Sequence, residues 1–335
     1  MAERLGVSPS TVSRVLSGKA AQSRISANTR RRVLAEAARC NYTSISIAHS
    51  LRTQKNNSIG ILIPSLMNPY FAEMSSFIIQ EARRKRYTSI VIDTMEDEKE
   101  LREGIRQLTA RQVDGIIAIP CGTDSSFLEA VSHEVPVILI DRYYEESTLP
   151  YVSTNNYAGG YEATSSLISM GHSNIVCIQG VLNSTPNNER VKGYKDAMKE
   201  NGLEDYIKVV GNEFSIQNGY LETKLLLSDF CVPTAIFALS NNITLGAIKA
   251  IREAGLHIPD DISLFSYDNF SYMDYMEPPI TRISQPVEDM SMLATKILFE
   301  QIEQIETRTS NQIKLSPSII TGKSTRVLKN PENNL

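Results

Sequence analysis

From Ser58 onward, the chain alternates short apolar segments with longer amphipathic ones, and this alternation limits its possible folds more than any other feature. A short apolar segment predicts a buried strand, and an amphipathic segment with helical spacing predicts a covering helix. The repeated strand–helix–strand order therefore predicts an α/β core of parallel sheets flanked by helices, with right-handed connections. Strands are predicted at 59–63, 90–93, 115–119, 137–141, 175–179, 235–239 and 262–267. Helices are predicted near 70–86, 98–111, 124–133, 157–170, 190–201, 217–228, 241–254 and 287–306.

Polar and aromatic residues follow several of the predicted strands. Ligands of such sheets bind beyond the carboxyl ends of the strands, so these residues are candidates for a binding cleft. Each one alone could equally be a helix cap or a turn residue. Together they offer the amides, carboxylates, guanidinium groups and aromatic rings that bind a polyhydroxylated or heterocyclic ligand. The candidate segments are Asn68-Pro69-Tyr70-Phe71, Asp141-Arg142, Arg190, Ser240-Asn241-Asn242, Tyr267-Asp268-Asn269 and Gln285-Pro286.

A pattern of short, capped helices precedes the core. Ser8 is a suitable N-cap and Pro9 occupies the first helical position, so a helix is predicted from there to about Leu16. Ala2 and Gly6 are small and four residues apart, which allows a preceding helix to turn sharply against it. This is the helix-turn-helix arrangement, whose second helix enters the major groove of DNA. The polar face of that helix carries Ser10, Thr11, Ser13 and Arg14.

A further helix is predicted from Ala27 to about Arg39, with Ser26 as its N-cap and an apolar stripe of Val33, Leu34, Ala37 and Ala38. Its arginines at 30–32 could simply be solvated, but beside a helix-turn-helix we expect them to contact phosphates. Residues 1–58 carry ten Lys or Arg against two acidic residues, although the whole chain has a net charge of −4. A basic segment on an acidic body indicates a polyanionic partner for that segment alone.

Three segments of the sequence resemble the N-terminal and hinge signature of the LacI/GalR regulators: GVSPSTVSRVLSG, ISANTRRRVLAEAARCNY and SIAHSLRTQKNNSIGILIP. The resemblance continues to about residue 328. It implies that Arg14, with the positions of Pro9 and Ser10, contacts base edges, while Ser8, Thr11 and Ser13 hold phosphates. Because Pro9 and Ser10 have little hydrogen-bonding reach, we expect most of the direct readout from Arg14, paired with a guanine. The DNA-binding residues expected on this basis are Ser8, Pro9, Ser10, Thr11, Ser13, Arg14, Arg30, His49 and Leu51.

Residues 44–53 resemble the hinge helix of that family, which folds on the operator and inserts a leucine into the minor groove. Leu51 stands at the position of that leucine, although an ordinary linker with an isolated leucine is the alternative. The usual Pro-Asn start of the hinge is Thr43-Ser44 here, and His49 replaces the usual basic or amide residue. The first helix has barely one turn, which nucleates poorly. Either Met1 is an internal methionine of a longer protein, or the DNA-binding domain is weakened.

The resemblance also implies a periplasmic-binding-protein-like core, with an effector cleft between two subdomains and three chain crossings near Ser153, Arg282 and Leu315. Asn242 departs from the aspartate that is common at its position, which keeps hydrogen bonding but removes a charge. The effector-binding residues expected on this basis are Tyr70, Phe71, Arg142, Arg190, Asn242, Asp268 and Gln285.

Four segments are predicted on this basis. Residues 1–43 form a small all-α helix-turn-helix domain with an apparently truncated first helix, and residues 44–57 form the hinge helix or linker. Residues 58–328 form the effector-binding and dimerisation core, and residues 329–335 are a tail. Within the core, the N-subdomain spans about 58–152 and 283–314, and the C-subdomain spans about 153–282 and 315–328.

The sequence offers no catalytic motif. It lacks a GxSxG elbow, a Walker A sequence and HExxH. The four histidines have no metal-ligand spacing to one another or to a cysteine, so we predict no catalytic residue, metal or cofactor. The four cysteines are far apart, which favours reduced thiols in the cytosol. No run of 18 apolar residues and no secretion signal is present, so we expect a cytoplasmic protein with no membrane partner.

We therefore expect a sequence-specific DNA-binding regulator that acts as a homodimer, since a pseudo-palindromic operator requires two recognition helices. Most family members repress and are relieved by a sugar, so the same is expected here, with a corepressor or an activating role left open. One alternative is a transport-type sugar-binding protein, which would need a signal peptide and no residues 1–58. Another is a sugar-binding sensor without DNA-binding competence. The sugar, the operator and the choice of dimer or tetramer stay open.

Overall fold

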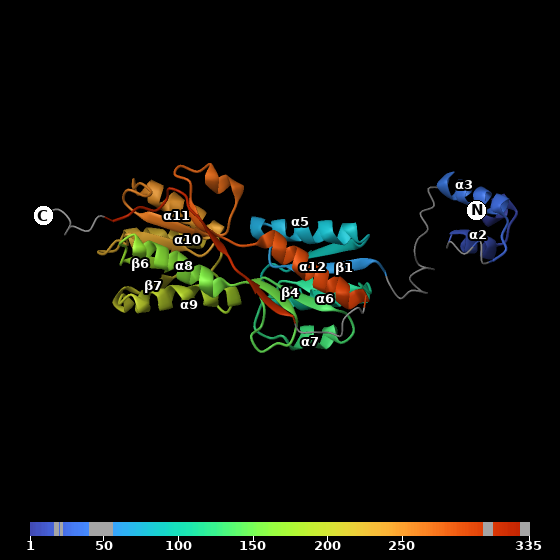
Figure 1. The fold of residues 1–335 in the computed structure, drawn as a ribbon, viewed down its shortest axis with the longest axis horizontal. Coiled ribbons are helices and arrows are strands. Elements are labelled where there is room, and N and C mark those ends of the chain that lie inside the picture. Colours follow the sequence, from blue (N-terminus) through green and yellow to red (C-terminus); the bar gives the residue numbers. More distant parts are fainter. Residues whose placement is uncertain (17–19, 21–22, 40–55, 304–310, 329–335) are drawn as a thin grey trace.

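A computed structural model describes residues 1–16, 20, 23–39, 56–303 and 311–328. The head contains α1 (Ala2–Leu5), α2 (Pro9–Leu16) and α3 (Ala27–Arg39) (Figure 1). α1 ends at Gly6, whose φ of 62° is in the left-handed region that glycine adopts without strain. The three helices enclose a small core around Val15, Ala20 and Val33.

The helix ends of the head follow the predicted capping. The Ser8 hydroxyl accepts a hydrogen bond from the backbone N–H of Thr11 at 3.1 Å, and Ser26 accepts one from Thr29 at 3.1 Å. The predicted stripe of α3 is only half right, because Val33 and Ala37 are buried whereas Leu34 is 45% exposed and Ala38 is exposed. Two short helices cover too narrow a face of α3 to bury all four residues.

The core contains two subdomains, each built on one sheet of the described residues. The sheet of the N-subdomain has the strand order β11-β5-β4-β3-β1-β2, with every neighbouring pair parallel. Its strands are β1 (Ser58–Ile63), β2 (Thr88–Asp93), β3 (Gly115–Ala118), β4 (Val137–Ile140), β5 (Tyr151–Thr154) and β11 (Gln312–Leu315).

The sheet of the C-subdomain has the order β12-β10-β9-β8-β6-β7. Its neighbouring strands are parallel except for β10 and β12, which pair antiparallel. Its strands are β6 (Ile175–Ile178), β7 (Lys208–Val210), β8 (Ala235–Ala238), β9 (Ser263–Tyr267), β10 (Thr281–Ser284) and β12 (Ser318–Ile320).

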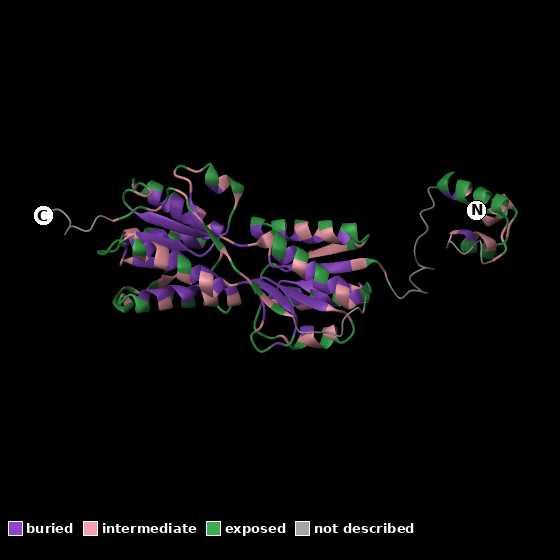
Figure 2. Cartoon of the chain, in the orientation of Figure 1, coloured by how far each residue is buried: buried purple, intermediate pink, exposed green. Residues whose placement is uncertain are grey.

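Helices cover both faces of each sheet, so the strands are buried while the outer helix faces are exposed (Figure 2). In the N-subdomain, α5 (Pro69–Arg84) and α12 (Val287–Glu303) cover one face, and α6 (Glu98–Ala110) and α7 (Ser126–Ser132) cover the other. In the C-subdomain, α8 (Asn156–Ser169) and α9 (Thr185–Glu200) face α10 (Ile216–Leu227) and α11 (Asn241–Glu253) across the sheet. The predicted parallel α/β core is confirmed.

The chain passes between the two sheets three times: from β5 to α8, from β10 to α12, and from β11 to β12. Ser153, Arg282 and Leu315, the residues near which the sequence predicts crossings, lie in β5, β10 and β11. β11 and β12 form opposite ends of one short stretch, yet each is the edge strand of a different sheet. Beyond β12, the hydroxyl of Ser324 donates to the Leu264 carbonyl at 2.6 Å and anchors this stretch to β9.

Five strands of the described residues were not predicted from the sequence: β5, β7, β10, β11 and β12. Each has three or four residues and includes polar side chains, so it lacks the continuous apolar run of a central strand. α9 also begins at Thr185, earlier than the predicted start near 190. Its first turn is Thr-Pro-Asn-Asn, in which Pro186 is tolerated because the first helical N–H groups need no partner within the helix.

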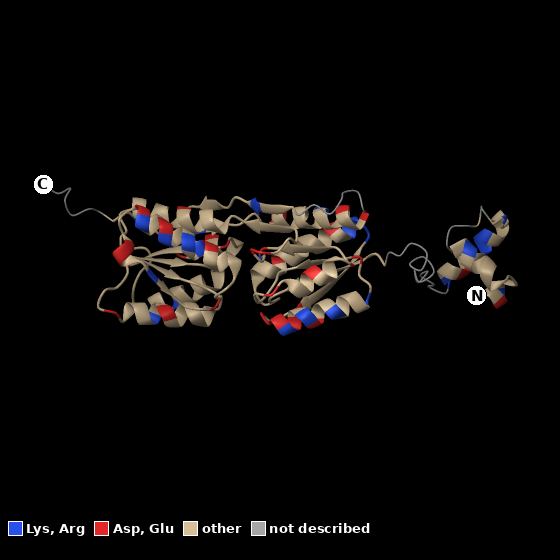
Figure 3. Cartoon of the chain, turned by 90° about the horizontal axis from the view of Figure 1, so that it is seen from below, with Lys and Arg blue, Asp and Glu red and all other residues tan. Residues whose placement is uncertain are grey.

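Charge is distributed differently over the two parts of the chain. In the view of Figure 3, arginines dominate the charged side chains of the head, whereas the core helices carry both signs. Among the described residues, no helix combines the length and the apolar character needed to cross a membrane.

Candidate functional site

The candidate site begins where β4 and β9 end. The residues that follow these strands, Asp141 and Asp268, both adopt left-handed backbone conformations, with φ of 65° and 75°. This conformation is uncommon outside glycine, and aspartate tolerates it better than most residues. The sharp turn directs both carboxylates into the space between the subdomains, where the two residues are 3% and 4% exposed.

Tyr70 and Gln285 connect these two carboxylates. The hydroxyl of Tyr70 lies 2.8 Å from Oδ1 of Asp141 and 3.2 Å from Oε1 of Gln285. The Gln285 amide in turn donates to Oδ1 of Asp268 at 2.7 Å. A polar chain thus runs from the N-subdomain, through the β10–α12 crossing, to the C-subdomain. Phe71 packs edge-on against Tyr70, with 5.3 Å between the ring centroids.

Arg190 approaches from α9. Its Nε donates to Oδ1 of Asn156 at 2.7 Å, its Nη1 donates to the Leu239 carbonyl at 2.8 Å, and its guanidinium lies 3.6 Å from the ring centroid of Tyr267. Gly160 on α8 permits this approach, because a Cβ there would lie 2.2 Å from the Arg190 carbonyl oxygen. Gly160 therefore serves the close packing of α8 against α9.

Arg142 turns away from this chain toward Glu96, on the loop after β2. Nη1 and Nη2 of Arg142 lie 2.7 and 2.8 Å from Oε2 and Oε1 of Glu96, and the guanidinium lies 5.6 Å from the Phe71 ring centroid. Beside this ion pair, about 230 Å³ of cavity lies between the loops of the two subdomains, with Cys121 and Ser184 also in its wall.

In the described part of the chain, Asn242 is linked to the other expected effector residues through its neighbour Asn241, whose Nδ2 donates to Oδ1 of Asn242 at 3.4 Å. Asn242 is half-buried, and its amide donates to the Phe214 carbonyl at 3.2 Å. Its neighbour Asn241 is fully buried instead, and the Asn241 backbone N–H donates to Oδ2 of Asp268 at 3.2 Å. Oδ1 of Asn241 is buried without a hydrogen-bond partner among the described residues.

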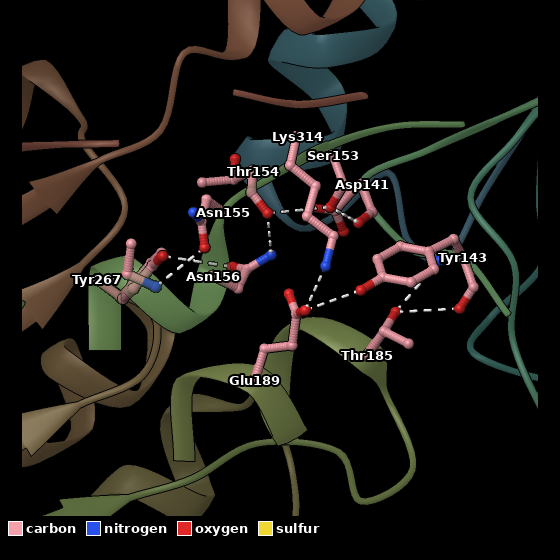
Figure 4. A network of polar contacts seen from close by, with 11 residues as sticks. Asp141, Tyr143, Ser153, Thr154, Asn155, Asn156, Thr185, Glu189, Tyr267 and Lys314 are labelled. Atoms are coloured by element: carbon pink, nitrogen blue, oxygen red, sulfur yellow. Dashed lines mark hydrogen bonds and ion pairs between the residues drawn. The ribbon is translucent and has the colours of Figure 1, made fainter. Parts of the chain in front are cut away.

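A second set of contacts joins the subdomains beside the site (Figure 4). The Tyr143 hydroxyl donates to Oε1 of Glu189 at 2.9 Å, and Lys314 on β11 donates to the same oxygen at 2.6 Å. The backbone N–H of Tyr143 also donates to the Thr185 hydroxyl at 3.2 Å. Glu189 precedes Arg190 on α9, so these contacts fix the helix turn from which Arg190 extends.

Burial dominates the electrostatics of the site. Desolvation raises the pKa of Asp141 above its ordinary value, against the opposing effect of Arg142 and Arg190. Desolvation likewise raises the pKa of Asp268, opposed by Arg190 and by the hydrogen bond from Gln285. Burial, with Asp141 as the next cause, raises the pKa of Tyr70, so its hydroxyl stays protonated and able to donate. The site therefore holds carboxylates at a cost to folding, which is typical of binding sites.

The variant Asp141→Asn is expected to stabilise the effector-free protein by about 1 kcal/mol, because it removes a buried charge and retains an acceptor for Tyr70. The pKa of Asp141 is higher in the folded protein than in the unfolded chain. The protonated Asp141 therefore contributes stability at pH values below its unfolded-state pKa, and this contribution is lost as the pH rises through its folded-state pKa. Chemical denaturation at several pH values above about 4 measures both effects.

The asparagine variant should lose less stability than the wild type as the pH rises. The control is Asp205→Asn on the exposed surface, which should change stability by no more than about 0.5 kcal/mol at any pH. Parallel curves for the wild type and Asp141→Asn would contradict the pKa assignment.

The expected DNA-binding residues in the head are mainly on its surface. Ser8, Pro9, Ser10, Ser13 and Arg14 are exposed, and Thr11 is half-buried. The Ser8 hydroxyl lies 2.8 Å from that of Ser10 and 2.9 Å from that of Thr11, a cluster of small donors at the start of α2. Arg30 is exposed on α3. His49 and Leu51 lie outside the described residues.

Asn156 and Glu96 are missing from the sequence prediction, and Asp141 and Asn241 lie in its candidate segments but not among its effector-binding residues. Asp141 and Asn241 directly precede residues that were chosen, so their place after a strand was a usable signal. Nothing in the sequence signals that Glu96 pairs with Arg142, because 46 residues separate them. Among the described residues, no group of three His, Cys, Asp or Glu side chains could hold a metal ion.

Comparisons with known proteins agree with this division of the chain. A family model described as periplasmic binding proteins and sugar binding domain of LacI family matches residues 56–321. Another, described as bacterial regulatory proteins, lacI family, matches residues 1–44. The ribose operon repressor of Haemophilus influenzae is 32% identical over 326 residues, which covers 96% of each protein.

Solved structures that are similar in sequence also have the same fold. The Lac repressor dimer bound to operator and the anti-inducer ONPF has a TM-score of 0.85 and 26% identity, covering 97% of each chain. A LacI family transcriptional regulator from Enterococcus faecium with bound ribose has a TM-score of 0.73 and 28% identity, covering 81% of this chain and all of that one. The resemblance found in the sequence is confirmed over both parts of the molecule, and the chain belongs to the LacI family of bacterial regulatory proteins.

Proposed function

We propose that this protein is a transcriptional repressor that binds operator DNA through its head and releases it when a small sugar binds between the subdomains. The observation that carries the proposal is the combination, in one chain, of the capped helix α2 with the buried polar chain from Asp141 to Asp268. Regulation by a ligand requires two coupled sites: without the polar site no ligand could change DNA binding, and without the helix ligand binding could not affect DNA.

On the DNA side, we assign base readout to Arg14 and phosphate contacts to the hydroxyls at the start of α2. The exposed side chains of Ser8, Ser10 and Ser13 support this assignment, since short hydroxyls reach phosphates but few base edges. Arg30 adds a cation on the neighbouring helix. The hinge role of His49 and Leu51 belongs to the same proposal.

On the effector side, ribose is the first candidate. It is bound in the similar regulator from Enterococcus faecium, and it appears in the name of the Haemophilus influenzae relative. Carboxylates, a guanidinium group and an amide, such as those of Asp268, Arg190 and Gln285, bind the hydroxyls of a sugar, while aromatic faces cover its C–H groups. Tyr70 and Phe71 supply such rings.

The protein would act as a homodimer in the cytoplasm, without catalysing a reaction. A two-fold operator presents two half-sites, and one head reads one of them. The similar Lac repressor is a dimer on its operator, which supports this assembly. The sugar acts through its different affinity for the two relative orientations of the subdomains, which the contacts of Tyr143 and Glu189 help to fix.

A sensor without DNA-binding competence is the second candidate, because the buried polar chain of the core could bind a sugar whether or not the head binds DNA. Selection of bound duplexes from a random DNA pool, followed by fluorescence anisotropy on the selected duplex, separates the two. We expect a clear sequence preference and an affinity that ribose lowers by about tenfold or more. Ribose binding without any sequence preference would establish the sensor instead, and DNA binding that no sugar changes would refute the effector role.

A further inference from the structure

Among the described residues that line the cavity at the edge of the cleft, Arg142 supplies the guanidinium, and that group is held in an ion pair with Glu96. The two contacts of this pair, at 2.7 and 2.8 Å, have the parallel geometry with which arginine binds a carboxylate or a phosphate. The side chain of Arg142 is 6% exposed and that of Glu96 is 33% exposed. A negatively charged ligand would therefore have to compete with a carboxylate that the protein itself provides.

The other positively charged side chain of the site, Arg190, does not replace Arg142 as a binding group for an anionic ligand. Within the described site, two guanidinium groups, Arg142 and Arg190, face the carboxylates of Glu96, Asp141 and Asp268. A further carboxylate in the cavity wall, that of Glu98, is paired with Arg102. Arg190 is held by Asn156 and by the Leu239 carbonyl. Burial raises the pKa of Asp141 and Asp268, whereas the arginines oppose that rise, so the positive charge of the site already acts on its own acids.

The cavity beside the pair can still receive a polar group. It has a volume of about 230 Å³, and Ser184 in its wall is 6% exposed. Oγ of Ser184 is buried without a hydrogen-bond partner among the described residues. A buried hydroxyl without a partner is costly, and a ligand hydroxyl would satisfy it. The groups facing the cavity thus suit a neutral polyol better than an anion.

We propose that Glu96 determines the charge specificity of the effector site: by occupying the guanidinium of Arg142, it restricts the site to uncharged sugars and excludes sugar phosphates. This inference rests on the proposed function, namely that the cleft binds a sugar. Glu96 is a positioning residue, since it acts on the ligand through Arg142. Without Glu96, the same guanidinium would bind a phosphate at two points.

The test is isothermal titration calorimetry, which measures the affinity of the full chain for each member of a panel. The panel contains free pentoses and hexoses and their phosphate esters, including ribose and ribose 5-phosphate. We expect the wild type to prefer the free sugar by about tenfold or more, because a close like charge is unfavourable in a poorly solvated site. Glu96→Gln should shift the ratio of the two affinities toward the phosphate by about tenfold or more. Glu96→Asp, which keeps the charge, should retain the preference of the wild type.

Glu103→Gln provides the matched control. It makes the same chemical change on α6, where Glu103 pairs with Arg106 on the surface, and it should leave the ratio unchanged. Because each result is a ratio of two ligands on one protein, a general loss of stability cannot produce the expected shift. Equal binding of sugar and phosphate by the wild type, or an unchanged ratio in Glu96→Gln, would overturn the role of Glu96 while the sugar site stands. If no member of the panel binds, the proposed function falls, and the inference falls with it.

Discussion

Replacing Arg190 with alanine is expected to weaken sugar binding by about a hundredfold, while operator binding without the sugar changes little. Arg190 is the cation held inside the C-subdomain half of the site, and its guanidinium lies flat against Tyr267. Truncation would remove the donors for a ligand and the stacked cation together. Calorimetric titration with ribose measures the first effect, and anisotropy on operator DNA measures the second.

Arg190→Lys serves as the companion variant, because alanine removes the Arg190 donor from the Leu239 carbonyl and one of the two donors, the other being the Tyr267 hydroxyl, from Oδ1 of Asn156. Lysine keeps the charge but loses the planar fork, so we expect it to bind the sugar almost as weakly as alanine. Lys195, further along α9 and exposed, gives a control substitution to methionine with unchanged sugar affinity. Loss of operator binding in Arg190→Lys would instead mark Arg190 as a structural residue of the core.

The second large effect is expected at the recognition helix. Arg14→Ala should cost about 1–3 kcal/mol of specific binding and relax the preference at one base pair, as expected for a guanidinium that pairs with a guanine. Arg14 lies in the last turn of α2 and is exposed, so its loss should leave the small core around Val15 and Val33 intact. Competition between specific and random duplexes measures the ratio of affinities.

Arg30→Ala is the contrasting variant. A phosphate contact there would weaken specific and random DNA alike and reduce the salt dependence of log K by about one. If Arg14→Ala left the specificity ratio unchanged, or if Arg30→Ala altered it more than Arg14→Ala did, the assignment of base readout to α2 would be wrong.

The sequence predicts the central part of each sheet well and the edges poorly. Segments such as 59–63 and 137–140 are continuous apolar runs, because helices cover them on both faces. β10 and β12 have the sequences TRIS and SII, whose pairing depends on partners brought together by the chain crossings. Local pattern carries no information about such partners, so these strands could not be found before the fold was known.

In the candidate site, too, some residues could be predicted from the sequence pattern and others could not. Tyr70, Arg190, Asp268 and Gln285 were predicted because they follow strands or begin helices, and the structure brings them into contact with one another or with their neighbours, although their role in binding stays a prediction. The pairing of Arg142 with Glu96 was not found, because it depends on which loops meet above the sheet. Asn242 was chosen over Asn241 on family resemblance alone, whereas burial and the contact with Asp268 favour Asn241.

β11 and β12 are synthesised after the strands β5 and β10 with which they pair. On the ribosome the chain emerges from its N-terminus, so ten strands are available before residues 312–320 appear. Until then, β5 and β10 each expose an unpaired edge, and such edges recruit other strands. Both subdomains therefore complete their sheets at the same point of synthesis, and a nascent chain arrested before residue 312 would present two unpaired strand edges at once.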